Sequence, residues 1–252
     1  MRKPGEDTHA TKETAEFYEK EATVYDRKRT RTGIGAYVGS VSEELVGRLT
    51  SDLTGKRVLE IGSGTGRWTS LLARQGAKVA ALDISHSMLT TTREKLRSSG
   101  LFGDVCLFQA NGTSLPVKDS TFDAVVSIHV FTHIADHAAT AKEISRVLKP
   151  GGMLIGNYLN LLSYYWPYGL LVNAFKKSLR AGVFTRWHTL SALKRDYAAA
   201  GLRLEEVVGQ VHFPSSVDSE VVTSVIRAMD RASRSSFLRY LAPTLFLRAV
   251  KV

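Results

Sequence analysis

Three glycines at alternate positions follow an apolar segment that contains one acid. Gly62, Gly64 and Gly66 come after Val58-Leu59-Glu60-Ile61, and a helical pattern begins at Arg67. Glycine serves where a backbone turns sharply or approaches a bound group more closely than a Cβ allows. A buried strand that runs into such a turn and then into a helix is typical of the nucleotide-binding edge of a doubly wound α/β sheet. The stretch therefore predicts a site for an adenine-containing ligand.

An aspartate further along the chain supports this prediction. Asp83 ends the second predicted strand, and a carboxylate there can accept hydrogen bonds from both ribose hydroxyls of an adenosine. The dinucleotide fingerprint would have glycine at position 67, where this chain has Arg67. A charged side chain there would crowd the close packing of helix on strand. The glycines and Asp83 by themselves still leave an NAD enzyme as an alternative.

The surrounding residues alternate between strand and helix patterns. Strands are predicted at 57–61, 78–83, 104–108, 122–128 and 152–158. Helices are predicted between them at 67–75, 86–98 and 136–148. The pattern continues with a helix at 189–200, a strand at 203–210, an apolar helix face from Val217 to Met229 and a strand at 245–250. Such alternation requires right-handed crossovers and predicts a mainly parallel sheet.

Two further helices are predicted ahead of the first strand, at 9–31 and 37–49. The first contains a basic run, Arg27 to Arg31, which is most simply a solvated face. No repeat or linker divides the chain, so we predict a single domain over residues 1–252. Its parts are an N-terminal helical cap at 1–50, a cofactor-binding core at 51–158, a lid insertion at 159–188 and a C-terminal completion of the sheet at 189–252.

The composition of the 252 residues narrows the classes of partner and compartment. A net charge of +10 favours acidic partners such as nucleic acid or anionic lipid, although a basic soluble surface explains it equally well. The single cysteine, Cys106, excludes a disulfide framework and a cysteine metal cluster, and it fits a reducing compartment. The first twenty residues lack an apolar stretch, so nothing suggests secretion and we predict a cytoplasmic location. The histidines lack the close spacing of a metal site, and none is predicted.

No charged residue occurs between positions 149 and 176, which raises the hypothesis of a transmembrane helix. Pro167 and two glycines interrupt the run, and the amides of Asn157, Asn160 and Asn173 would need partners in lipid, so we reject this hypothesis. The second half predicts a lid over an apolar ligand or a peripheral membrane contact, with a helix packed on the sheet as the alternative. The aromatic residues behind this prediction are Tyr164, Tyr165, Trp166, Tyr168, Phe175, Phe184 and Trp187.

Five segments decide which ligand the glycine turn holds. In chain order they are Val58–Gly66, Leu82–Leu89, Ala110–Val117, Ser120–Ser127 and Arg146–Gly152. In these segments the sequence resembles the class I S-adenosylmethionine-dependent methyltransferases, the seven-stranded Rossmann-like group that modifies small molecules and lipids. The resemblance implies an α/β fold with a doubly wound, mainly parallel sheet of seven strands. An N-terminal helical cap and a substrate-lid insertion after the fifth strand would complete it.

The resemblance also implies S-adenosylmethionine as cofactor and S-adenosylhomocysteine as product. Asp83 would take the ribose hydroxyls, and Glu60 with the glycine turn would hold the methionine end. Asn111 stands where the family usually has aspartate, and its carbonyl can accept the same hydrogen bond without a charge. The predicted cofactor-binding residues are Tyr18, Tyr25, Glu60, Gly62, Ser63, Gly64, Gly66, Asp83, Ile84, Met88, Asn111, Gly112, Thr113, Ile128 and His129.

Methyl transfer from a sulfonium is an in-line displacement by an already activated donor. The protein must therefore align the reactants and exclude water, and it needs a base only if the acceptor loses a proton. His129 and His133 follow the fourth strand, whose carboxyl end faces the cofactor in such sheets, so both are candidate catalytic residues. His188 and His212 are weaker candidates.

We predict S-adenosylmethionine-dependent methyl transfer to an oxygen, nitrogen or carbon atom of a hydrophobic or aromatic small molecule, such as a natural product, quinone or lipid-like compound. The alternative acceptors are a nucleic acid, suggested by the basic charge, or a protein. No Asn/Asp-Pro-Pro-aromatic signature of amino-directed nucleic-acid enzymes occurs in the chain. A cofactor-binding protein without turnover is the third hypothesis, and a dehydrogenase the fourth.

Overall fold

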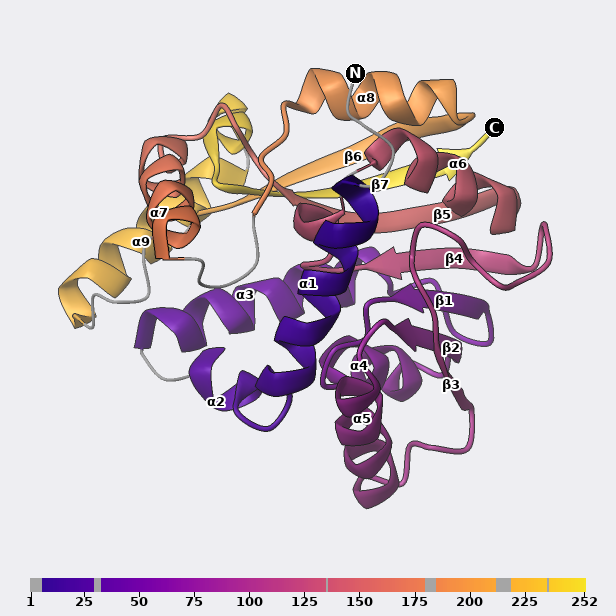
Figure 1. Ribbon diagram of the computed structural model, residues 1–252. Helices are drawn as coiled ribbons and strands as arrows, with labels where there is room; N and C mark the ends of the chain where they lie inside the picture. The colour runs from indigo at the N-terminus through magenta and orange to yellow at the C-terminus, as the bar shows by residue number, and fades with distance from the viewer. Residues whose placement is uncertain (1–5, 30–32, 135, 180–184, 212–218, 235) are drawn as a thin grey trace.

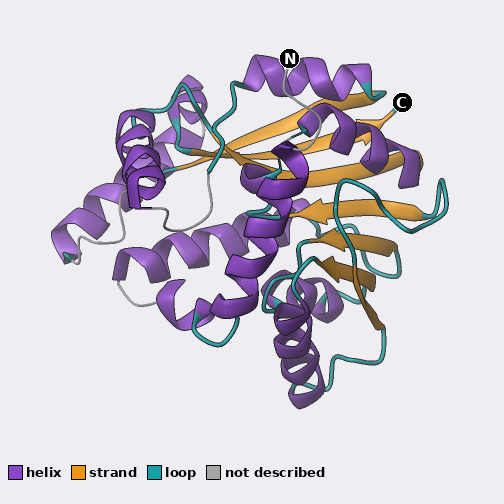
Figure 2. Cartoon of the chain, viewed as in Figure 1, coloured by secondary structure: helices purple, strands orange, loops and turns teal. Residues whose placement is uncertain are grey.

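The computed structural model describes residues 6–29, 33–134, 136–179, 185–211, 219–234 and 236–252. These residues form a single seven-stranded sheet in the order β3-β2-β1-β4-β5-β7-β6, covered by helices on both faces (Figures 1 and 2). The strands are β1 Arg57–Ile61, β2 Lys78–Asp83, β3 Val105–Gln109, β4 Phe122–Ser127, β5 Leu148–Leu159, β6 Leu202–Gln210 and β7 Thr244–Lys251.

The first five strands are all parallel, whereas β7 runs antiparallel between β5 and β6. This arrangement confirms the predicted mainly parallel, Rossmann-like sheet. The five-strand prediction for residues 57–158 places every strand correctly, but β5 begins four residues earlier than expected, at Leu148. The register shift between Phe122 and Ala124 on β4 marks an irregularity in its pairing with that early segment.

Helices α4, α5, α6, α8 and α9 lie where helices are predicted, whereas α7 lies in the stretch predicted as a lid insertion. Their bounds are α4 Arg67–Arg74, α5 His86–Ser98, α6 His137–Val147, α7 Trp166–Leu179, α8 Leu190–Ala199 and α9 Glu220–Arg234. Two hydrophobic clusters cover the two faces of the sheet. One includes Ile144 of α6 and Leu193 of α8, and the other includes Leu72 of α4 and Leu96 of α5. Two short 3-10 helices, η1 Phe131–His133 and η2 Phe237–Leu241, complete the described elements.

The N-terminal prediction needs a correction. The helix expected over 9–31 is two helices, α1 Glu6–Glu21 and α2 Tyr25–Arg29, and residues 30–32 lie outside the described part. Between them Ala22 is buried, and the β-branched Thr23 and Val24, which are poor helix formers, sit in a turn. The second predicted helix is confirmed as α3 Gly33–Leu49, which begins four residues early.

Two acids fasten this cap to the core. The carboxylate of Glu19 accepts from Ser85 Oγ at 2.7 Å and Ser87 Oγ at 2.6 Å, at the N-terminus of α5. These hydrogen bonds lower the pKa of Glu19 to about 2. Asp26 of α2 accepts from Lys95 Nζ at 2.7 Å and from Thr65 Oγ1 in the glycine turn. The cap is therefore held directly over the carboxyl ends of β1 and β2.

The insertion after β5 contains α7 and returns to the sheet through a segment at 185–188. The backbone of this segment is tied on both sides, since Arg186 N donates to Thr132 O in η1 and His188 N donates to Leu159 O. The amides predicted to need partners have them at two positions: Asn157 bonds to His129, and Asn160 bonds to Tyr240 O and Ala242 O. The side chain of Asn173 lies outside the described residues. No described helix has the length and apolar character that crossing a membrane requires.

Candidate functional site

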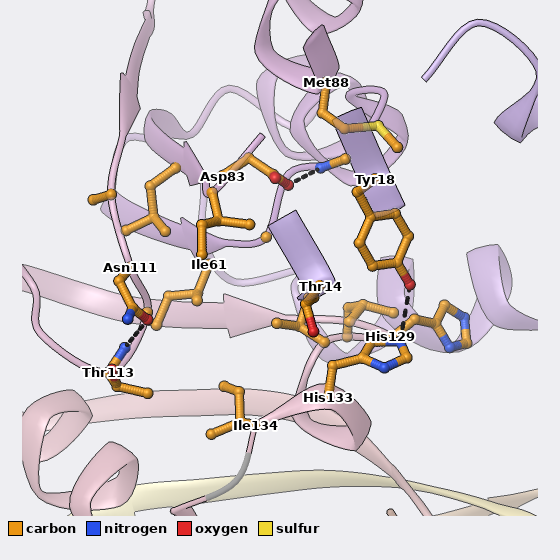
Figure 3. Close-up of a pocket in the computed structure, with 18 of the residues that line it drawn as sticks. Thr14, Tyr18, Ile61, Asp83, Met88, Asn111, Thr113, His129, His133 and Ile134 are labelled. Carbon is orange, nitrogen blue, oxygen red and sulfur yellow. Dashed lines mark hydrogen bonds between the residues drawn. The ribbon is translucent and has the colours of Figure 1, made fainter. Parts of the chain in front are cut away.

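A cavity of about 360 Å³ opens at the carboxyl ends of the parallel strands, beneath α1 (Figure 3). Sites for small ligands commonly occupy such volumes at this edge of an α/β sheet. The lining includes many of the residues predicted from the sequence. It comprises Thr14, Tyr18, Tyr25, Ile61, Gly62, Gly64, Leu82, Asp83, Ile84, Met88, Ala110, Asn111, Gly112, Thr113, Ile128, His129, Val130, His133, Ile134, Asp136 and Ala139.

The glycine turn requires glycine for two different reasons. Gly62 has a φ of 75°, and a Cβ there would lie 2.2 Å from Cγ2 of Val130. Gly64 has a φ of 54°, but its missing Cβ would meet no atom within 4 Å, because the residue faces the cavity. Gly62 therefore allows the strand end to pack against the segment after β4. Gly64 leaves space where a ligand can approach the backbone.

Arg67, in place of the third glycine of a dinucleotide fingerprint, turns away from this packing. Its Nη2 donates to Gly39 O at 2.7 Å and pairs with Glu43 of α3 at 3.1 Å, and its guanidinium lies 4.8 Å from the centre of the Trp68 ring. The side chain joins α4 to α3 and stays outside the cavity lining.

Asp83 is held rigidly at the cavity wall. Its Oδ2 accepts from Gly64 N at 2.8 Å and its Oδ1 accepts from Ser85 N at 2.9 Å. Burial raises the pKa of this carboxyl group, while the backbone hydrogen bonds act in the opposite direction. Each carboxylate oxygen can accept a second hydrogen bond. A pair of vicinal hydroxyls is the group that such an oriented carboxylate suits.

An apolar slot adjoins Asp83. Ile84 and the buried Met88 line one part of it, and Asn111 to Thr113 line another. Asn111 Oδ1 accepts from Thr113 N at 3.0 Å, which fixes the turn and leaves that oxygen with one further lone pair. These residues therefore fit a flat, weakly polar ring next to a ribose, as adenosine provides.

Three predicted cofactor contacts do not line this cavity: Glu60, Ser63 and Gly66. Glu60 is fully buried, Thr69 Oγ1 donates to its Oε2 at 2.6 Å, and desolvation raises its pKa to about 7. Within the described residues, Glu60 Oε1 and Ser63 Oγ have no hydrogen-bond partner. Gly66 caps α4, and its missing Cβ would lie 2.8 Å from Thr92 Cγ2. These three residues therefore contribute to the structure of the glycine turn without lining the cavity.

His129 is held in place by Asn157, which is not part of the cavity lining. Its φ of 63° is unusual for a residue with a bulky side chain. Its backbone N–H donates to Asn157 Oδ1 at 2.6 Å, and its Nδ1 lies 3.0 Å from Asn157 Nδ2. Because the carbonyl of the Asn157 amide accepts from a backbone N–H, its NH₂ group must donate to Nδ1. The hydrogen-bond network thus assigns the neutral His129 its proton on Nε2.

His133 instead pairs with the N-terminal cap. Its Nε2 lies 2.9 Å from Tyr18 Oη, and the Tyr18 ring packs edge-on against the rings of His133 and Tyr25. Figure 3 shows Asp83 and Asn111 on one side of the cavity and Tyr18, His129 and His133 on the other. After the roles predicted from the sequence, we call these sides the cofactor wall and the acceptor wall.

Sequence reasoning missed part of the acceptor wall. Thr14 lies four residues before Tyr18, so helical spacing from Tyr18 could have identified it. Ile134, Asp136 and Ala139 follow His133 and carry no motif. Asn157 was recognised only as an amide in need of a partner.

The weaker histidine candidates do not join the cavity lining. His188 packs against His137 with ring centres 3.9 Å apart, and desolvation lowers the pKa of both groups to about 4. His137 Nε2 bonds to Phe131 O at 2.9 Å, so this pair supports η1 from below. His212 lies outside the described residues.

The predicted aromatic lid is also absent from the cavity lining. Tyr164, Trp166 and Tyr168 are exposed on the outer surface, and Tyr165 packs against Trp187. Phe184 and the side chain of Phe175 lie outside the described part of the chain. The role of the insertion as a lid therefore stays a prediction.

Residues 59–156 match the methyltransferase domain family. The ubiquinone/menaquinone biosynthesis C-methyltransferase UbiE of Cronobacter sakazakii is 39% identical over 104 residues, which cover 40% of this chain and 41% of that protein. UbiE of Escherichia coli O1:K1 is 39% identical over 115 residues, covering 43% and 46%. The matched part thus spans less than half the length of these curated relatives.

Solved structures share the fold over nearly the whole chain. Magnesium protoporphyrin IX methyltransferase from Synechocystis, with bound S-adenosylhomocysteine, has a TM-score of 0.69 at 16% identity and covers 96% of this chain and 100% of that one. A Haloferax volcanii putative methyltransferase structure, in complex with the activator Trm112, has a TM-score of 0.67 at 20% identity, with coverage of 93% and 97%. Residues 59–156 are therefore similar to the methyltransferase domain family, and nearly the whole chain shares the fold of these solved structures.

Proposed function

We propose that this chain transfers the methyl group of S-adenosylmethionine to an oxygen, nitrogen or carbon atom of a hydrophobic or aromatic small molecule. The observation that carries the proposal is the cavity with two unlike walls. A carboxylate and an apolar slot on one side suit adenosine, and two histidines with a tyrosine face them amid apolar side chains. The matching relatives named for quinone biosynthesis support an apolar acceptor.

On this proposal Asp83 binds the ribose hydroxyls, while Ile84, Met88 and Asn111 hold the adenine. The open face of Gly64 admits the methionine end. When bound, the cofactor supplies a methyl group on a sulfonium, ready for in-line displacement. The chain then aligns an acceptor between Ile128, Ile134 and the acceptor wall, and α1 excludes water.

Proton removal falls to His133 rather than His129. His129 carries its proton on Nε2, since Asn157 occupies Nδ1, so it serves as a hydrogen-bond donor. The Nε2 atom of His133 pairs with a tyrosine hydroxyl that can donate to it. An acceptor that loses a proton on methylation gives it to Tyr18 Oη, while the hydroxyl proton of Tyr18 moves to His133 Nε2. An acceptor that does not lose a proton uses the wall for alignment alone.

The test combines calorimetry and turnover. We expect S-adenosylhomocysteine to bind, and labelled methyl groups from S-adenosylmethionine to reach a member of a panel of hydroxyquinones, phenols, indoles and fatty acids. His133→Ala should lower transfer to a phenolic acceptor about 100-fold or more, the usual range of general-base effects, and leave cofactor affinity unchanged. His86→Ala, at an exposed histidine on α5, is the matched control.

Three outcomes would contradict the proposal. Cofactor binding without transfer to any acceptor would indicate a binding protein without turnover. Methylation of RNA with a steep salt dependence would indicate a nucleic-acid enzyme. Tight NADH binding without S-adenosylhomocysteine binding would indicate a dehydrogenase.

We further propose that the chain acts as one domain over residues 1–252, in the cytoplasm. Continuous pairing of the sheet from β3 to β6 supports a single unit. The exposed, free thiol of Cys106 supports a reducing compartment. If limited proteolysis released a stable fragment that lacked some of the seven strands, the single-domain proposal would be wrong.

A further inference from the structure

One end of the molecule exposes apolar side chains on three segments. They are the start of the insertion with α7, the outer side of α9, and η2. Leu171, Val221 and Phe237 are 72%, 74% and 75% exposed, values far above those of ordinary partly covered surface residues. Elsewhere among the described residues, the large apolar side chain with comparable exposure is Val252. The apolar residues are therefore concentrated, and we call this region the apolar end surface.

Hydrogen bonds and packing join the three segments. Asn160 Nδ2 donates to Tyr240 O at 2.7 Å and to Ala242 O at 3.0 Å, which ties the start of the insertion to η2. In turn, η2 packs against α9 and β6. Figure 1 shows α7 and α9 at the same end of the sheet, remote from β3. The three segments that carry the exposed groups thus lie at one end of the sheet.

Helix α9 shows why this surface is not an ordinary solvated face. Its inner side is satisfied, since Ile226 is fully buried and the buried Asp230 accepts from Val211 N at 3.1 Å. Its outer side carries a second apolar row with a four-residue spacing, Val221, Val225 and Met229. A helix that already buries one face needs no such row for folding.

The charges indicate what covers the surface. Residues 150–175 carry no charge, and α9 adds the exposed Arg227 and Arg231 against a single exposed acid, Glu220. Tyrosine and tryptophan side chains accompany the aliphatic ones, as in protein surfaces that sit at a membrane interface. A second copy of the chain would bring arginines against arginines with few exposed acids to pair them.

We infer that the apolar end surface docks on a membrane with anionic headgroups. The aliphatic and aromatic side chains enter the boundary between headgroups and acyl chains, and Arg231 meets lipid phosphates. The net charge of +10 attracts the whole molecule to such a surface.

This surface also connects to the acceptor wall. A Cβ on Gly169 of α7 would lie 2.1 Å from Trp187 Cζ2, so α7 packs closely on the returning segment. The adjacent Arg186 N donates to Thr132 O, one residue before His133. Docking would thus place the acceptor wall near the bilayer that holds an apolar acceptor. That consequence rests on the proposed function, whereas docking itself does not.

Vesicle flotation with the full chain tests the inference. We expect binding to phosphatidylcholine vesicles that contain phosphatidylglycerol, and about tenfold weaker binding to phosphatidylcholine alone or at high salt. Leu171→Glu and Val225→Glu should each weaken binding about tenfold, because each removes apolar contact and adds repulsion. Arg231→Gln should weaken it about fivefold, the effect of one surface cation near anionic lipid. Val252→Glu, an equally exposed apolar position outside the surface, should change little.

Calorimetry with S-adenosylhomocysteine on the same variants shows whether each retains its fold and its cofactor site. Because vesicle binding is measured without acceptor or turnover, failure of the proposed methyl transfer leaves this test intact. Wild-type protein that ignores anionic vesicles would overturn the inference. It would also be overturned by equal binding of Leu171→Glu and Val252→Glu, or by a dimer in light scattering that Leu171→Glu abolishes. Specific capture of an acidic protein in place of vesicles would likewise overturn it.

Discussion

The two walls of the cavity are assembled from parts at very different distances along the chain. On the cofactor wall, Asp83 bonds to Gly64 across 19 residues, and Asn111 bonds to Thr113 across two. On the acceptor wall, Tyr18 reaches His133 across 115 residues, and Asn157 reaches His129 across 28. The first wall is a property of neighbouring strand ends, whereas the second exists only after the cap and β5 have packed.

The groups that hold the side chains in place also differ between the two walls. Backbone N–H groups hold Asp83 and Asn111, so these side chains depend on the path of the main chain. The ring nitrogens of His129 and His133 are held by an amide and a phenol from other elements. We therefore expect substitutions on the cofactor wall to affect binding and folding, and those on the acceptor wall to affect proton position and turnover.

The largest expected effect is on the cofactor wall. Asp83→Ala removes a charged acceptor for two hydroxyls, and each such bond contributes about 1.5–3 kcal/mol, so S-adenosylhomocysteine affinity should fall about 100-fold or more. Calorimetry measures the affinity for S-adenosylhomocysteine. Asp104→Ala, at an exposed aspartate before β3, is the control and should bind normally. An affinity within about twofold of wild type would show that Asp83 does not bind the ribose.

The two walls meet where Gly62 touches Val130. Gly62→Ala combines positive φ with a clash at 2.2 Å, and we expect a loss of about 3 kcal/mol in the free energy of unfolding. Gly64→Ala shares the positive φ but not the clash, so about 1 kcal/mol should be lost. Urea denaturation compares the two. Val130→Ala should partly rescue Gly62→Ala, and equal losses at both glycines would rule out the packing contact.

The sequence was sufficient for the cofactor wall because its parts are local. Gly62, Gly64 and Asp83 lie in motifs whose spacing reflects strand–turn–helix geometry, and the structure brings them to one cavity. Strand and helix bounds in the core agreed within a few residues for the same reason. Glu60 shows the limit, because the motif gives its position but not the direction of its side chain, which turns to Thr69.

The acceptor wall could be foreseen only in outline. Both histidines were expected after β4, but their different partners depend on tertiary packing that no local pattern encodes. The break at Ala22 that positions α2, and the acids Glu19 and Asp26 that fasten the cap, gave no periodic signal. The insertion shows the same limit, since aromatic composition predicted apolar contact without distinguishing an inner lid from an outer surface.

Folding stability should depend on pH in opposite directions through Glu60, next to the glycine turn, and through His137 and His188, which support η1. The pKa of Glu60 is raised from 4.5 to about 7, so the native state holds the extra proton and stability from this group is lost as pH rises from 4.5 to 7. Glu60→Gln should abolish this loss, which we expect to be about 2 kcal/mol.

Urea denaturation at pH 5 and pH 7.5 measures the difference between variant and wild type. Taking that difference matters because His137 and His188, with pKa values lowered to about 4, act in the opposite sense and lose stability as pH falls from 6.5. A constant difference between variant and wild type across this range would show that Glu60 is ionised throughout.

The smallest effect tests the acceptor wall most directly. Asn157→Asp keeps an acceptor for His129 N–H but replaces the NH₂ donor with a second oxygen, which accepts instead from Nδ1–H. The neutral ring should then carry its proton on Nδ1, and the new carboxylate should raise its pKa. Nitrogen-15 NMR of His129 would report both changes. Turnover should fall about tenfold, which is less than the loss of a general acid or base causes, because the ring itself is retained. Asn160→Asp, at a buried asparagine whose side chain bonds to Tyr240 O, Ala242 O and Leu162 N and not to a histidine, is the matched control. An unchanged His129 tautomer in Asn157→Asp would mean that the ring is positioned by the backbone alone, and the two walls would then be built in the same way.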